Sequence, residues 1–152
     1  HLSSSLLFLS YGTLTDEFQH QVYSQPALSP AERRQIWRQL EKKYLPHRDY
    51  AGQPFLEAGG FWFQQGHIFE VPFYYIDYVL AQVSVFQLWE RANQERAQAW
   101  NDYLAFCRAG GSLPFTGLLK EAKLHSPFAP GCVDSVAKAV KAWLEQVDDS
   151  RL

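Results

Sequence analysis

The spacing of hydrophobic residues predicts a chain that is built from α-helices. In several segments apolar residues recur every three or four positions, which is the period of a helix that buries one face. The aromatic-rich segment 55–65 could also form a strand, but no other segment is suited to pair with it. We therefore predict an all-α, multi-helical fold. Helical segments are expected at residues 1–24, 30–45, 55–65, 71–89, 97–109, 112–124 and 133–147.

The segment 71–89 is the most apolar one and is expected to form the central helix. Pro72 suits the first turn of a helix, where its missing N–H breaks no hydrogen bond. Asp77 and Gln82 interrupt the apolar run, so we interpret the segment as a buried core helix and not as a membrane span. Its apolar positions leave almost no polar face, and they are Val71, Phe73, Ile76, Val79, Leu80, Val83, Phe86 and Trp89.

The helix expected at residues 30–45 has the clearest boundaries. Ser29, Pro30 and Glu32 match the capping-box pattern of a helix start, and Pro46 ends the helix. Its charged residues are interpreted as a solvated face, and the acidic groups among them argue against a nucleic-acid patch. These residues are Arg33, Arg34, Arg38, Glu41, Lys42 and Lys43.

Glycines predict interruptions elsewhere in the chain. Gly12 weakens the first helix near its middle and marks a candidate break. Gly110 and Gly111 are expected to end the helix before them, and Ser112 could cap the next one.

Composition and charge narrow the classes of function. A chain of 152 residues with 47% hydrophobic and 16% aromatic residues can build a core, and we expect residues 1–152 to form one helical unit. The net charge of −2 and the lack of a Lys/Arg run argue against nucleic-acid and membrane partners. Cys107 and Cys132 have neither zinc-site nor disulfide spacing, which favours a reducing, cytoplasmic location. Because the chain begins at His1 and contains no methionine, we expect it to be a fragment of a larger protein.

Candidate functional residues occur near the start of the predicted central helix. Tyr74, Tyr75 and Tyr78 are spaced so that Tyr78 shares a helix face with each of the other two, and His67 lies just upstream. Three phenols and an imidazole are a donor set that could stabilise an oxyanion. From the pattern alone, however, aromatic residues at this spacing are more often core residues.

A second candidate is the pair Glu17 and His20. The spacing Glu-x-x-His occurs in bundles that bind two metal ions through carboxylates. Such a site needs a second Glu-x-x-His and two further Glu residues, and the sequence has no second copy. We therefore favour a surface pair, or one that supports a site without binding metal.

Taken together, three stretches resemble a known family of peptidases. They are Asp16–Tyr23, then Gly66–Phe69 with Pro72–Tyr78, and then Gly110–Ser112, and the middle stretch is the specific one. The chain resembles, over essentially its whole length, the C-terminal part of the catalytic domain of oligoendopeptidase F. That enzyme is a member of the thimet-oligopeptidase-like family of zinc metallopeptidases.

The resemblance implies a zincin-like oligopeptidase fold, with a deep channel and a zinc ion on its wall. In such enzymes two His residues of an H-E-x-x-H motif and a further Glu bind the zinc, and the Glu of the motif activates the zinc-bound water. The sequence contains no H-E-x-x-H, and in the family the zinc ligands lie upstream of the matched region. We expect zinc in the parent enzyme, no metal on this chain alone, and no activity without the remainder of the catalytic domain.

The resemblance also assigns roles to the ring cluster. His67 would bind a substrate carbonyl or the oxyanion of the tetrahedral intermediate. Tyr78 matches the family's tyrosine most securely, because Val-Leu-Ala follows it, while Tyr74 and Tyr75 compete for a second role. The expected substrates are short peptides that are cut at internal bonds.

Two other readings compete with this one. The chain could be a stand-alone, non-catalytic helical module that binds a peptide or protein partner in an aromatic groove. Such a module would fold alone, whereas an isolated fragment would expose apolar surface and tend to self-associate. A di-metal carboxylate bundle around Glu17 and His20 is the least favoured reading.

Overall fold

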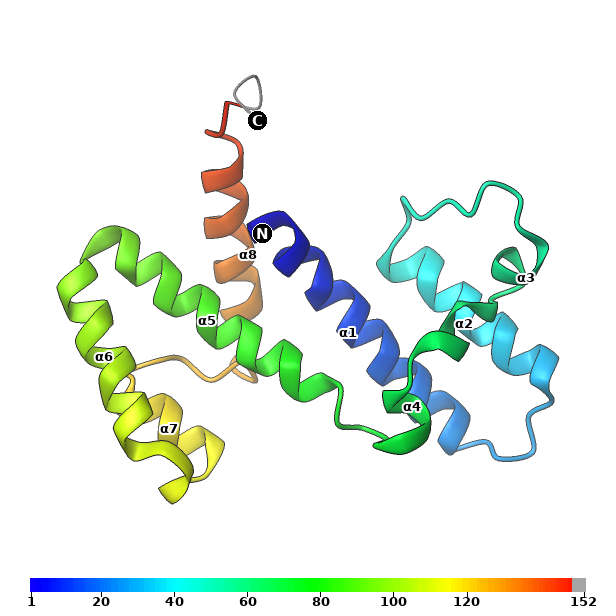
Figure 1. The fold of residues 1–152 in the computed structure, drawn as a ribbon, viewed down its shortest axis with the longest axis horizontal. Coiled ribbons are helices and arrows are strands. Elements are labelled where there is room, and N and C mark those ends of the chain that lie inside the picture. Colours follow the sequence, from blue (N-terminus) through cyan, green and yellow to red (C-terminus); the bar gives the residue numbers. More distant parts are fainter. Residues whose placement is uncertain (149–152) are drawn as a thin grey trace. The chain divides into compact units, whose positions relative to one another are not determined.

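The computed structural model describes residues 1–148, and every regular element in that range is a helix (Figure 1). The predicted all-α fold is confirmed. Among the helices of residues 1–148, none combines the length and the hydropathy that a membrane span requires. The elements in chain order are α1 (Leu2–Tyr23), α2 (Pro30–Tyr44), α3 (Pro54–Glu57), the 3₁₀ helix η1 (Gly60–Gln64), α4 (His67–Glu70), α5 (Ile76–Gln94), α6 (Arg96–Ala109), the 3₁₀ helix η2 (Gly110–Ser112), α7 (Phe115–Glu121) and α8 (Cys132–Leu144).

Contacts along the chain group into two compact units. The first unit is Leu7–Val79, and the second unit combines His1–Leu6 with the chain from Leu80 onward. The boundaries fall inside α1 and α5. The expectation that residues 1–152 act as one unit stays a prediction.

The first unit has a core of large aromatic and aliphatic side chains. The ring of Phe18 on α1 lies 5.1 Å from that of Trp37 on α2 and 5.1 Å from that of Trp62 on η1, measured between ring centroids. Each such side chain contributes roughly 1.5–3 kcal/mol when it leaves water. The core therefore fixes α1, α2, η1 and α4 against one another. Its buried residues are Leu14, Phe18, Trp37, Leu40, Leu45, Trp62 and Ile68.

Helix α1 is continuous through Gly12, so the predicted break is wrong. The glycine has a packing role instead, because a β-carbon at this position would lie 2.2 Å from Cγ2 of Val79. Gly12 therefore allows the start of α5 to approach the backbone of α1.

Helix α2 begins and ends as the sequence predicts. The Ser29 side chain accepts a hydrogen bond from the Glu32 N–H at 3.3 Å, and the Ser29 N–H donates to Glu32 Oε2 at 2.7 Å. Its predicted solvated face is wrong for Glu41, which is fully buried, and only Lys42 and Lys43 are exposed. The three arginines of that face are half-buried, namely Arg33, Arg34 and Arg38.

The predicted central helix begins later than expected. Helix α5 begins at Ile76, and the residues before it form a turn in which Phe73 has a φ of +64°. Pro72 lies in that turn and not in a first helical turn. Nor is α5 buried on all sides, since Val83 is buried whereas Val85 is 52% exposed.

The second unit has a smaller core. Leu119, Ala122 and Leu124 are buried, and Leu88, Phe106 and Phe115 pack against them. Helix α6 ends before Gly110, as predicted, and that residue has a φ of +48°.

The predicted cap of the next helix is wrong. Helix α7 starts after Pro114, and the Ser112 hydroxyl instead donates backward to the Ala109 carbonyl at 2.5 Å.

Candidate functional site

The predicted site residues lie together in the first unit. The His67 ring centroid is 4.8 Å from that of Tyr75 and 5.9 Å from that of Tyr78. Tyr78 in turn lies 5.4 Å from Tyr74 and 5.7 Å from Tyr75, measured between centroids. The sequence therefore identified a real cluster of one imidazole and three phenols.

The reason for the clustering differs from the predicted one. Only Tyr78 lies on α5, because Tyr74 and Tyr75 belong to the turn between α4 and α5. The Tyr74 N–H donates to the Val71 carbonyl at 3.2 Å, and the Asp77 N–H donates to the Tyr74 carbonyl at 3.0 Å. A folded-back turn, and not helical periodicity, brings the three phenols to one place.

Helix α1 holds this turn in place. The Phe73 N–H donates at 2.7 Å to Oε1 of Gln19, a fully buried side chain. The Phe73 ring lies 4.9 Å from the ring of His20 and 5.3 Å from that of Tyr23. A positive φ at a bulky residue costs about 1–3 kcal/mol and persists only where its surroundings enforce it. Gln19 was not singled out in the sequence, because an isolated glutamine carries no signal of this role.

The three tyrosines differ in exposure. Tyr74 is 48% exposed and Tyr78 is 43% exposed. Tyr75 is half-buried, and its ring packs 5.7 Å from that of Phe8 and 6.0 Å from that of Tyr11. Tyr74 and Tyr78 are therefore open to a ligand, while Tyr75 supports the His67 ring from behind.

Tyr75 and Tyr78 are neutral donors near pH 7. Hydrogen bonding to Tyr74 raises the pKa of Tyr78 above its ordinary value. Burial, and then the neighbouring Tyr78, raise the pKa of Tyr75. Because an unperturbed phenol has a pKa near 10, upward shifts keep the O–H intact at physiological pH. The cluster can donate hydrogen bonds to a developing negative charge.

His67 is the first residue of α4, and hydrogen bonds hold both its ring and the start of that helix. The amide Nε2 of buried Gln65 lies 2.7 Å from His67 Nδ1, and the Tyr11 hydroxyl donates to Gln65 Oε1 at 2.9 Å. On the following residue, the Ile68 carbonyl accepts a hydrogen bond from the Tyr23 hydroxyl at 2.8 Å. Both contacts tie α4 to α1.

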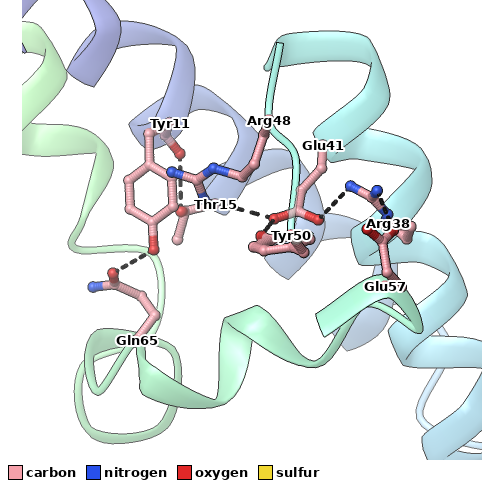
Figure 2. A network of polar contacts seen from close by, with 8 residues as sticks. All are labelled: Tyr11, Thr15, Arg38, Glu41, Arg48, Tyr50, Glu57 and Gln65. Atoms are coloured by element: carbon pink, nitrogen blue, oxygen red, sulfur yellow. Dashed lines mark hydrogen bonds and ion pairs between the residues drawn. The ribbon is translucent and has the colours of Figure 1, made fainter. Parts of the chain in front are cut away.

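A buried polar network lies behind these contacts (Figure 2). The Glu41 carboxylate accepts a hydrogen bond from the Tyr50 hydroxyl and is paired with Arg38 at 3.4 Å and with Arg48 at 3.7 Å. The Arg48 guanidinium lies 5.7 Å from the centroid of the Tyr11 ring. A buried carboxylate that lost these partners would be strongly destabilising, so the network constrains the geometry around Tyr11.

Glu17 and His20 do not form a common site. Glu17 accepts hydrogen bonds from the Tyr44 hydroxyl and from Lys43 Nζ, the latter at 2.8 Å, whereas His20 pairs with Asp16 at 3.4 Å. Within residues 1–148 no group of three His, Cys, Asp or Glu side chains is placed to hold a metal ion. Both cysteines are free thiols. The hypothesis of a di-metal site around Glu17 and His20 therefore has no support in the described residues.

Comparisons with known proteins give one consistent result. No protein-family model and no curated protein matches the chain. Among solved structures, a protein assigned as oligoendopeptidase F matches 100% of this chain and 27% of its own, at 60% identity and a TM-score of 0.95. PZ peptidase A with an inhibitor matches 98% of this chain and 26% of its own, at 56% identity and a TM-score of 0.94.

A third structure, assigned as an oligoendopeptidase F from Bacillus anthracis, matches 100% of this chain and 24% of its own. Its identity is 47% and its TM-score 0.80. The chain thus spans about a quarter of the length of each structure that it matches. The resemblance to oligoendopeptidase F that the sequence motifs suggested is confirmed, and this chain matches one part of such a peptidase along its whole length.

Proposed function

We propose that this chain is the substrate-binding and oxyanion-stabilising part of a zinc-dependent oligoendopeptidase that hydrolyses internal bonds of short peptides. The observation that carries the proposal is the ring cluster, which presents two exposed phenols beside an imidazole. The similarity to peptidases at 47–60% identity supports it. A stand-alone binding module is not favoured, because the match to peptidases extends over the entire chain.

Within this proposal the phenols act on the reacting carbonyl. When water attacks a peptide bond, the carbonyl oxygen gains negative charge that it did not carry in the bound peptide. A donor aimed at this oxygen therefore stabilises the transition state more than the bound substrate. Tyr78 and Tyr74 are the exposed phenols and fill this role, and His67 donates to a substrate carbonyl.

Zinc would be bound outside this chain. The sequence has no H-E-x-x-H, and residues 1–148 bring no three suitable ligands together. The residues present do not fit a zinc site, so the ligands would come from the remainder of the parent catalytic domain. When bound, zinc would supply an activated water at neutral pH. This chain alone would then be inactive and free of metal.

The isolated chain is also expected to self-associate. Apolar side chains on α5 and α6 are exposed in the second unit, among them Val85 and Trp100. Exposed apolar surface of this kind favours association when nothing covers it.

The test is the replacement of Tyr78 by phenylalanine in the full-length protein. Loss of one oxyanion donor should lower turnover of a short peptide by about 10²–10³-fold. The zinc content, measured by atomic absorption, should stay the same, because the phenol is not proposed as a ligand. Tyr103→Phe is the matched control, since Tyr103 is an exposed phenol of the second unit. Wild-type turnover in Tyr78→Phe and in Tyr74→Phe would remove the phenols from the mechanism.

A further inference from the structure

Tyr11 and the neighbouring residues Gln65 and His67 form a hydrogen-bond relay that ends at the His67 ring. Tyr11 on α1 donates to the amide oxygen of Gln65 at 2.9 Å, and the amide nitrogen lies 2.7 Å from His67 Nδ1. We propose that Gln65 and Tyr11 are positioning residues which hold the neutral His67 imidazole in the tautomer that carries its proton on Nε2. The consequence for catalysis rests on the proposed function, whereas the tautomer itself does not.

The chemistry of the amide gives the direction of the relay. In a glutamine side chain Oε1 only accepts hydrogen bonds and Nε2 only donates them. When Oε1 faces the Tyr11 hydroxyl, Nε2 must face His67 and donate to it. A nitrogen of neutral imidazole that accepts a hydrogen bond carries no proton, so Nδ1 is bare and the proton is on Nε2.

The opposite amide orientation is disfavoured by the surroundings of Tyr11. If the amide were reversed, Nε2 would donate to the phenol oxygen, and the Tyr11 O–H would lose Oε1 as its acceptor. Tyr11 is half-buried, and burial, with a further effect of Tyr75, raises the pKa of Tyr11 to about 12. The phenol therefore keeps its proton, and a partly desolvated O–H that loses its acceptor is disfavoured.

Neighbouring rings hold the imidazole itself. Tyr75 packs at 4.8 Å from His67 in a tilted arrangement, and Tyr78 meets His67 edge to face at 5.9 Å. Tyr75 also packs 6.0 Å from Tyr11, so the same side chains line both the relay and the imidazole. Rotation of the ring that would exchange Nδ1 and Nε2 has to displace these contacts. Together with the amide, they leave Nε2–H as the donor that His67 offers to a peptide carbonyl.

The first test observes the tautomer directly. In full-length protein labelled with ¹⁵N-histidine, the ring nitrogens of His67 are assigned by comparison with a His67→Asn variant. In the neutral imidazole we expect a pyridine-type shift at Nδ1 and a pyrrole-type shift at Nε2. A pyrrole-type Nδ1 in the wild-type protein would overturn the proposal.

Variants of Gln65 then test its role. Gln65→Glu keeps the shape of the side chain but presents only acceptors, so it should draw a proton onto Nδ1 and reverse its shift. Gln65→Leu and Tyr11→Phe should mix the two tautomers. Tyr23→Phe is the control, because it removes a phenol bond to α4, at the Ile68 carbonyl, without touching the amide. Unchanged shifts in Gln65→Glu would also overturn the relay.

Measurements of kcat/KM distinguish a failure of the relay from a failure of the proposed function. Gln65→Leu should lower kcat/KM for a short peptide by about 10-fold, which is less than the loss of an oxyanion donor, because only the orientation of His67 changes. If the tautomer shifts as expected but kcat/KM does not fall, the relay stands and the catalytic role of His67 fails.

Discussion

The two units use the same residue types for opposite purposes. In the first unit Trp37 and Trp62 both pack against Phe18, and the three side chains leave almost no surface in water. In the second unit aromatic residues of α5 and α6 line an open apolar groove of about 860 Å³. Trp100 in this groove is 58% exposed, whereas Trp37 is fully buried. Tryptophan at helical spacing therefore says little about burial until the neighbouring helices are known.

The two units also differ in how rigidly they can hold functional side chains. Tyr75 packs against Tyr11, which contacts both the aromatic core and the Arg48 guanidinium of the Glu41 network. Gln65 holds His67, so this side of the ring cluster is kept in one geometry. Fixed donors contribute more to catalysis than mobile ones, because no reorganisation is needed during reaction. The open groove offers no comparable support, since its wall is apolar and exposed.

The largest expected effect is on the free energy of unfolding, when Trp37 and Trp100 are compared. Trp37→Ala should lower the free energy of unfolding by about 3–5 kcal/mol, because it leaves a cavity in the core. Trp100→Ala should change it by less than about 0.5 kcal/mol, since its side chain is already exposed. Denaturant unfolding of the 152-residue chain at low protein concentration, followed by circular dichroism, measures both. Equal losses in the two variants would contradict the comparison.

A smaller effect is expected at two glycines. Gly12→Ala places a β-carbon 2.2 Å from Val79 Cγ2, and such overpacking costs about 1–3 kcal/mol. Gly111→Ala is the matched control, because its β-carbon would meet no atom within 4 Å. The midpoint of thermal unfolding should fall only in the first variant. A drop in Gly111→Ala of the same size would show that local backbone effects, and not packing, explain the result.

The smallest effect concerns the pH dependence of stability. Hydrogen bonds from Lys43 and Tyr44 lower the pKa of Glu17 in the folded protein. The carboxylate form is therefore favoured by folding, and its contribution is present above the ordinary pKa of about 4.3 and lost as the pH falls through the lowered value. Because Glu17 is partly solvated, Glu17→Gln should cost less than about 1 kcal/mol at pH 7.

The control for this experiment is an exposed ion pair. Asp134→Asn removes the pair with Lys138 on α8, where both side chains are mostly in water, and should change stability by less than about 0.5 kcal/mol. Unfolding free energies at neutral and acidic pH compare the two variants with wild type. A deficit of Glu17→Gln that persists at a pH well below the lowered pKa of Glu17 would mean that charge is not its cause.

Local signals predicted the fold where they act within one element. The capping box at Ser29 and the glycine after α6 set helix ends through bonds and backbone angles that involve neighbouring residues only. The start of α5 could not be found in this way. Phe73 adopts its positive φ because buried Gln19, 54 positions earlier, binds its N–H, and hydrophobic spacing does not encode such a contact.

In the candidate site, too, the sequence predicted which residues belong to it but not how they are arranged. His67 and the three tyrosines could be named from their sequence, and they do lie together. Which of them are exposed could not be predicted. Tyr74 is exposed and Tyr75 is packed against α1 only because of the turn before α5. Gln65 and Tyr11 also went unrecognised, because they lie 54 positions apart and neither belongs to a catalytic motif.

The sequence by itself determined the helical class, the bounds of α1, α2 and α6, the resemblance to a peptidase family and the identity of the ring cluster. These properties depend on composition, periodicity and short motifs, which are local in the chain. Only the tertiary structure decided which tyrosines are open, which aromatic residues are core and which amide faces His67. Those properties depend on contacts between residues far apart in sequence, and such contacts exist only once the helices have packed.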